Sequence, residues 1–172
     1  MFAKGLELVY GGKLPGGIGF REVFSAVVVS VDRVHQDGSL KLGVLADTGR
    51  FISLYGYIVA SLLDQRASGK LLMLITTSDW SYTNQVMTHT FDPFLKGGDK
   101  WRDLFEIVVV SASKPGFFTS SNPLYRVVDE ERGLLEPHFG SLGSGGVFYG
   151  GSAQLLEESL GLIGDEILYV GD

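Results

Sequence analysis

The chain has 172 residues, 45% of them hydrophobic, and a formal net charge of −6, which fits one globular domain or one domain with a subdomain. The acidic balance argues against a nucleic-acid partner, and the absence of cysteine excludes disulfides, thiolate metal sites and a cysteine nucleophile. No apolar run reaches the roughly 18 residues of a membrane span and the N-terminus lacks an export signal, so we expect a cytoplasmic protein without membrane contact.

The first part of the chain predicts helices after an irregular start. Residues 1–18 are rich in glycine without any period, which is typical of a loop or a ragged end. Apolar residues return every three or four positions over 20–35, which favours a helix, although the valines keep a strand possible. Shorter helices are expected at about 39–46 and 53–65, so that 19–69 forms one helical segment.

From residue 70 the pattern changes to alternating strands and helices. Apolar runs of strand length at 70–76 and 104–112 predict parallel strands that are covered on both faces. A capped helix lies between them, and the stretch 123–139 alternates about the acidic turn DEERG, which predicts a β-hairpin that leaves the sheet. A strand in GGVFYGG, a helix in SAQLLEESLG and a last strand at 166–170 follow. We therefore expect an α/β core over 70–172 with a mostly parallel sheet.

Polar side chains follow three of the expected strands. Thr76 and its neighbours come after the first, Lys114 after the second, and Asp172 after the last. Because the carboxyl ends of parallel strands share one edge of a sheet, we expect these groups to converge there. A hydroxyl, an ammonium group and a carboxylate suit a phosphoryl group and Mg²⁺. Taken singly, each has an ordinary alternative: residues Thr76 to Asp79 could cap a helix, Lys114 could be a surface lysine, and Asp172 could be a helix cap whose helix is absent.

The order of these residues and the text around them resemble the haloacid dehalogenase (HAD) superfamily, and within it the cytosolic purine 5′-nucleotidases. The matching stretches are ITTSDWSYTNQVM, FDPFLKGGDKWRDLFEIVVVSASKPGFF, GVFYGGSAQLLEESLG and GDEILYVGD, from about residue 19 to the end. The resemblance implies a HAD-like (Rossmannoid), mostly parallel three-layer sandwich, incomplete here and preceded by a helical cap-type segment. It also implies a Mg²⁺-dependent hydrolase that acts on nucleoside monophosphates or other small phosphate esters.

The same resemblance implies roles for individual residues of the core. Thr76 is the phosphate-binding hydroxyl, and Thr77, which replaces the usual Asn, lies with Ser78 in the substrate-binding loop. Lys114 is the motif lysine that assists catalysis, and Asp172 is the first magnesium-binding carboxylate of the last motif.

The helical segment resembles the part of these enzymes that faces the nucleoside. Asp32 and Lys41 match residues that help to hold the nucleotide. Val28 stands one helical turn before Asp32, where this branch often has an Arg, so a purine preference does not follow from the resemblance.

The nucleophile of the resembled family has no counterpart in the sequence. These enzymes carry D-x-D-x-T on a strand before the present motifs, and no such pattern occurs here. We therefore expect an internal fragment of a nucleotidase, with a homo-oligomer possible for the full-length protein. One alternative is a non-catalytic remnant that binds phosphate or a partner. A receiver-type signalling domain also places Asp, Thr/Ser and Lys at strand tips, but its acidic residues come before the Thr and Lys, which is not the order here.

The first prediction concerns activity. We expect the 172-residue chain to release no measurable phosphate from inosine or guanosine monophosphate with Mg²⁺, because the family reaction proceeds through an aspartyl-phosphate. The measurement is phosphate release by the purified chain beside a longer chain extended at both ends. Activity of the short chain that disappears in Lys114→Ala would contradict this prediction.

Overall fold

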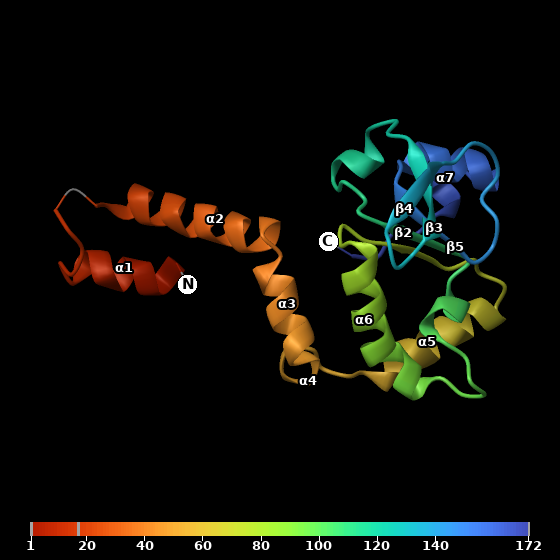
Figure 1. The fold of residues 1–172 in the computed structure, drawn as a ribbon, viewed down its shortest axis with the longest axis horizontal. Coiled ribbons are helices and arrows are strands. Elements are labelled where there is room, and N and C mark those ends of the chain that lie inside the picture. The colour runs from red at the N-terminus through yellow and green to blue at the C-terminus, as the bar shows by residue number, and fades with distance from the viewer. Residues whose placement is uncertain (1, 17, 172) are drawn as a thin grey trace. The chain divides into compact units, whose positions relative to one another are not determined.

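The computed structural model describes residues 2–16 and 18–171 and shows two compact units, Met1–Phe51 and Ile52–Asp172. The helices of the first unit are α1 (Phe2–Tyr10), α2 (Phe20–Gln36), α3 (Ser39–Ala46) and α4 (Thr48–Phe51). The second unit contains, in chain order, α5 (Gly56–Ala67), β1 (Met73–Ile75), α6 (Trp80–Phe91), β2 (Ile107–Val110), β3 (Leu124–Asp129), β4 (Leu134–Pro137), β5 (Gly146–Gly150) and α7 (Ala153–Leu160), with short 3₁₀ turns between them (Figure 1).

The first unit corrects one expectation and confirms two. The irregular start expected for residues 1–18 is wrong for Phe2–Tyr10, which form α1 and pack on α2. Gly5 suggested a loop, but it allows a close approach of the two helices, because a Cβ there would lie 2.5 Å from Val23 Cγ1. The helices expected at 20–35 and 39–46 are confirmed as α2 and α3. None of the helices in the described ranges combines the length and apolar character needed to cross a bilayer.

The second unit is built on a five-stranded sheet with the order β1-β2-β5-β3-β4. β1, β2 and β5 are parallel, whereas β3 and β4 form an antiparallel hairpin that joins β5 through β3. The expected α/β class with its parallel strands is confirmed. The hairpin is also confirmed, but it does not leave the sheet as expected: it extends the sheet at its antiparallel edge, where one face can remain solvated.

Helices cover both faces of the parallel strands (Figure 1). Successive side chains of a strand point to opposite faces, so Val108 and Val110 enter one core cluster and Ile107 and Val109 enter the other. The first cluster takes apolar residues from α5 and α6, and the second takes them from α7. All four β2 residues are at most 2% exposed. The result is the expected three-layer arrangement, compatible with a Rossmann-like fold.

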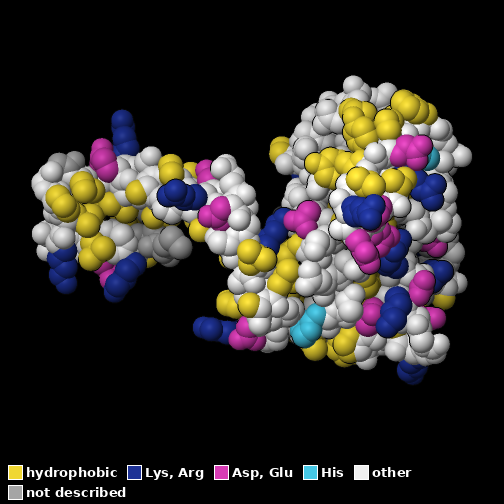
Figure 2. Space-filling model, viewed as in Figure 1, with side chains coloured by type: hydrophobic (Ala, Val, Ile, Leu, Met, Phe, Trp, Pro, Cys, Tyr) yellow, Lys and Arg dark blue, Asp and Glu magenta, His cyan; other side chains and the backbone are white. Residues whose placement is uncertain are grey.

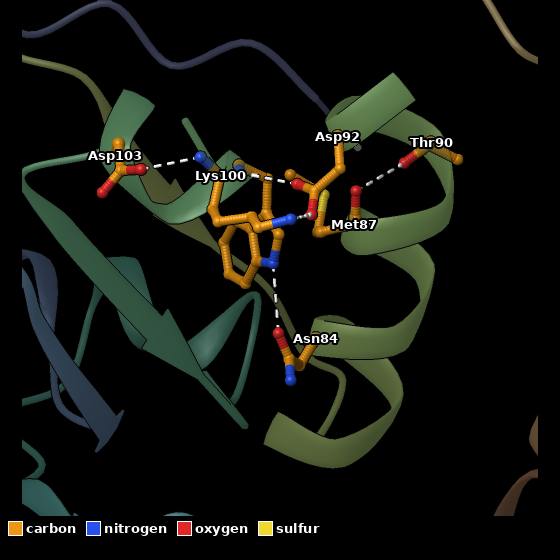
Figure 3. Close-up of polar contacts among 7 residues, drawn as sticks. Asn84, Met87, Thr90, Asp92, Lys100 and Asp103 are labelled. Carbon is orange, nitrogen blue, oxygen red and sulfur yellow. Dashed lines mark hydrogen bonds and ion pairs between the residues drawn. The ribbon is translucent and has the colours of Figure 1, made fainter. Parts of the chain in front are cut away.

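The turn before β2 is fixed to α6 by a buried tryptophan. Trp101 is 1% exposed, and its Nε1 donates a hydrogen bond to Asn84 Oδ1 over 3.1 Å. The backbone N–H of Trp101 donates to Asp92 Oδ1 over 2.8 Å, and Lys100 Nζ lies 3.3 Å from Asp92 Oδ2 (Figure 3). Both N–H groups of this buried residue therefore have a hydrogen-bond acceptor.

The last expected strand is not formed. Gly164–Glu166 make a 3₁₀ turn, and residues 167–171 pair with no strand of the described chain. Leu168 and Val170 are 86% and 84% exposed. A parallel strand needs a ladder partner and cover on both faces, and this segment has neither, so its apolar composition alone did not determine its structure.

Charged side chains are mixed on the face of the second unit that Figure 2 shows. Acidic and basic groups alternate there over short distances, and apolar patches lie between them. Within the second unit, Arg102 and Glu130 form an ion pair, with 2.7 Å between Nη1 and Oε1. Among the described residues visible on this face, the basic side chains do not gather into one continuous surface.

The second prediction concerns the stability of this unit. Trp101→Ala should lower the free energy of unfolding by about 3–5 kcal/mol, because it opens a cavity between the aromatic rings of Trp80 and Phe105. The measurement is urea denaturation followed by circular dichroism. Phe139→Ala is the matched control, since Phe139 is 90% exposed and its loss should change the free energy by less than about 0.5 kcal/mol. Equal effects of the two substitutions would contradict the prediction.

Candidate functional site

The loop after β1 leads directly into α6. Thr76 N–H donates to Val109 O over 2.9 Å and so extends the ladder between β1 and β2 by one residue. Ser78 N–H donates to Thr76 Oγ1 over 3.1 Å. Asp79 is the N-cap of α6, and its carboxylate accepts the Tyr82 N–H over 2.9 Å. The loop is therefore a strand-to-helix turn at the carboxyl edge of the sheet.

The loop after β2 is fastened to the first loop by backbone hydrogen bonds. Ser111 N–H donates to Ser78 O over 2.8 Å, and Ala112 N–H donates to Thr76 O over 2.9 Å. Lys114 N–H then donates to Ala112 O over 2.9 Å. The segments that carry Thr76 and Lys114 thus meet at one edge of the sheet, as the sequence predicted for two of its three strand-tip groups.

The side chain of Lys114 reaches the last part of the chain. Its Nζ donates to the Tyr169 hydroxyl over 2.8 Å and lies 5.3 Å from the centre of that ring. Tyr169 in turn packs edge-on against Phe118, with 5.0 Å between ring centres. Residues 167–171 therefore return to the edge that carries Lys114 although they form no strand. Sequence reasoning missed Tyr169, because it counted this residue only as part of a strand.

The ordinary interpretation of Asp79 as a helix cap is confirmed, and its carboxylate is engaged there. The expected magnesium ligand, Asp172, lies outside the described residues. Within 2–16 and 18–171, no three His, Asp or Glu side chains are grouped in a way that could hold a metal ion. Because Mg²⁺ is commonly bound through one or two carboxylates together with substrate phosphate, the assignment of Asp172 stays a prediction.

Asp32 and Lys41 lie in the first unit, on α2 and α3, and Val28 precedes Asp32 by one turn of α2. Asp37 joins these two helices. Hydrogen bonds from the Ser39 side chain and backbone hold the pKa of Asp37 below its usual value. The roles of Asp32 and Lys41 as nucleotide contacts stay predictions, as does the role of Thr77, which is exposed in the loop of the second unit.

A groove of about 310 Å³ adjoins the two loops. Its lining includes Asp79 from the first loop and Ser111 from the second, together with Trp80, Tyr149 and the hairpin turn 130–133. Apolar and aromatic surface beside polar loop atoms is common in sites for small organic ligands. The groove could therefore receive the part of a ligand that extends away from the loops.

Two comparisons relate the sequence to known proteins. Residues 10–172 match the model of the 5′ nucleotidase family. The human 5′-nucleotidase domain-containing protein 2 is 29% identical over 150 residues, which cover 87% of this chain and 28% of that protein. The chain thus spans 28% of the length of this relative.

The third prediction tests the cap at the start of α6. Asp79→Ala should lower the free energy of unfolding by about 1 kcal/mol, because the Tyr82 N–H loses its acceptor. Asp79→Asn keeps an acceptor oxygen and should change stability much less. Both values come from urea denaturation of the purified chain. A loss as large for Asn as for Ala would show that the charge, and not the cap hydrogen bond, is the important contribution.

Proposed function

The chain belongs to the 5′ nucleotidase family, and from this premise we propose that its second unit binds the phosphate group of a nucleoside monophosphate. The observation that carries this proposal is the junction of the two loops at the carboxyl edge of the sheet. Ser111 and Ala112 donate to the carbonyl groups of Ser78 and Thr76. These bonds join the loop after β1 (the hydroxyl loop, 76–79) to the loop after β2 (the lysine loop, 111–114) in one rigid region. Ligands of parallel α/β sheets commonly bind at this edge.

The chemistry of the two loops suits a phosphate. The hydroxyl groups of Thr76 and Ser78 can donate to phosphoryl oxygens, and the N-terminus of α6 follows immediately with its helix dipole. Lys114 adds an ammonium group, whose charge-assisted hydrogen bonds to an anion are stronger than neutral ones. In the structure this ammonium group donates to the Tyr169 hydroxyl over 2.8 Å.

We propose that the nucleoside part of the ligand contacts surfaces other than the two loops that bind the phosphate. The groove that shares Asp79 and Ser111 with the loops is the adjoining concave surface, and Trp80 and Tyr149 supply aromatic area there. Asp32 and Lys41 are kept as further contacts on the strength of the family resemblance alone. Val28 gives no charged group at the position where an Arg is common, so we propose no purine selectivity.

Hydrolysis is proposed for the whole protein and not for this chain by itself. The sequence contains no D-x-D-x-T pattern to supply an aspartate nucleophile. Asp172 is proposed to contribute one ligand to Mg²⁺, which when bound would neutralise phosphoryl charge. What the described residues supply is phosphate binding and charge compensation.

The fourth prediction tests phosphate binding. Lys114→Ala should weaken the binding of inorganic phosphate by roughly 10- to 100-fold, because a charge-assisted hydrogen bond is lost. Thr76→Val should weaken it less, because one neutral hydrogen bond is lost. The measurement is isothermal titration calorimetry of the 172-residue chain with inorganic phosphate.

The control is Lys70→Ala, which removes an exposed lysine that lies ahead of β1, at the opposite end of that strand, and contacts Gln65. It should leave phosphate affinity unchanged, because Lys70 belongs to neither loop. Equal losses for Lys70 and Lys114 would mean that only net charge matters and would reject the site. No binding by the unaltered chain would reject the proposal as a whole.

A further inference from the structure

Ser111 has an unusual backbone conformation at the end of β2. Its φ is 51°, and within residues 2–16 and 18–171 it is the one non-glycine residue with a positive φ. Such a conformation is unfavourable for a residue with a Cβ and persists only where the surrounding structure requires it. Ser111 is half-buried between the fully buried Val110 and Ala112, so it is no mobile surface loop residue.

The hydrogen bonds around Ser111 explain what requires this conformation. Thr76 N–H donates to Val109 O, and in a regular parallel ladder the next bond would run from Ser111 N–H to Thr76 O. Instead Ala112 N–H makes that bond, over 2.9 Å, and Ser111 N–H donates to Ser78 O over 2.8 Å. Ser111 is therefore one extra residue in the ladder, which is a β-bulge with its bulged residue in the left-handed region.

The bulge changes the direction of the chain after β2. Successive N–H groups of an extended strand point to opposite edges, so Ser111 and Ala112 would normally donate to different neighbours. Here both donate to the loop that follows β1. The chain has rotated at Ser111, and the residues that follow lead to Lys114, whose N–H donates back to Ala112 O. The left-handed turn at Ser111 thus determines where the lysine loop lies relative to Thr76.

We propose that Ser111 is a positioning residue that keeps the Thr76 loop and the Lys114 loop in the register needed to bind phosphate. It acts on phosphate binding through its backbone conformation and not by touching the phosphate. The inference rests on the proposed function for its effect on binding, but the bulge itself can be tested separately. A residue that tolerates a positive φ should preserve the site, and a β-branched residue should disrupt it.

The test compares four variants of the 172-residue chain at this position. Ser111→Val should weaken the binding of inorganic phosphate about tenfold, as measured by calorimetry, and should speed amide hydrogen exchange at positions 111 and 112. Ser111→Gly and Ser111→Asn should keep affinity within about twofold, since Gly and Asn adopt the left-handed region readily. Ser111→Ala should give an intermediate effect and replaces the valine variant if that variant does not fold.

The matched control is Gly161→Val at the end of α7. Gly161 has a φ of 65°, and a Cβ there would have no heavy atom within 4 Å, so the substitution imposes a backbone penalty at least as large as that of Ser111→Val without a clash. It should lower global stability and leave phosphate affinity and exchange at 111 and 112 unchanged. If Ser111→Val affects affinity and exchange no more than Gly161→Val does, Ser111 has only a general structural role and the inference is wrong.

The two proposals fail in different ways. If the unaltered chain binds no phosphate, the proposed function is rejected, and hydrogen exchange then decides about the bulge alone. Unchanged exchange at 111 and 112 in Ser111→Val would overturn the inference whatever the affinity. Faster exchange in that variant, restored in Ser111→Gly, supports the inference that the left-handed turn fastens the two loops.

Discussion

The structure of the second unit depends on β2, a strand of four residues that is buried on both faces. Ile107 and Val109 enter the cluster under α7, and Val108 and Val110 enter the cluster under α5 and α6. Burying one such side chain contributes about 1.5–3 kcal/mol, so these four positions together outweigh any single polar contact at the surface. Because both helical layers pack on the same strand, the ends of β2 are fixed in space. The loops that begin and end there are therefore held in defined positions.

Backbone hydrogen bonds also hold the residues just beyond both ends of β2 in place. At the amino end Glu106 N–H donates to Leu72 O over 3.0 Å, and Gly145 N–H donates to Glu106 O over 2.8 Å. At the carboxyl end Ala112 reaches Thr76 in the same way. β1, β2 and β5 are therefore joined beyond their regular ladders. Side-chain substitutions leave such backbone contacts in place unless they change the local φ and ψ, which makes Ser111 more sensitive than its exposure suggests.

The sequence predicted those elements whose signal is local and periodic. The apolar runs predicted β1 and β2, although both strands are shorter than the expected ranges 70–76 and 104–112. No local pattern in the sequence indicates the positive φ of Ser111. This conformation results from the one extra residue by which the end of β2 is out of register with the chain that follows β1. The last expected strand was wrong for a related reason: apolar composition indicates that a segment can form a strand, but the partner that makes it one is not local. The strand-tip pattern predicted that the loops of Thr76 and Lys114 would meet, which the backbone hydrogen bonds between them confirm, but it could not indicate Tyr169.

The segment 167–171 shows how a chain can reach a sheet edge without joining the ladder. Tyr169 is held by the Lys114 ammonium group and by the edge of Phe118, whereas Leu168 and Val170 on either side of it remain exposed. A strand would have buried the alternate residues and paired every backbone group, so this side-chain attachment is the weaker of the two arrangements. It nevertheless ties the segment before Asp172 to the lysine loop. Since the Lys114 loop is itself fixed to Thr76 by the bulge, the position of this segment depends in the end on the same buried strand.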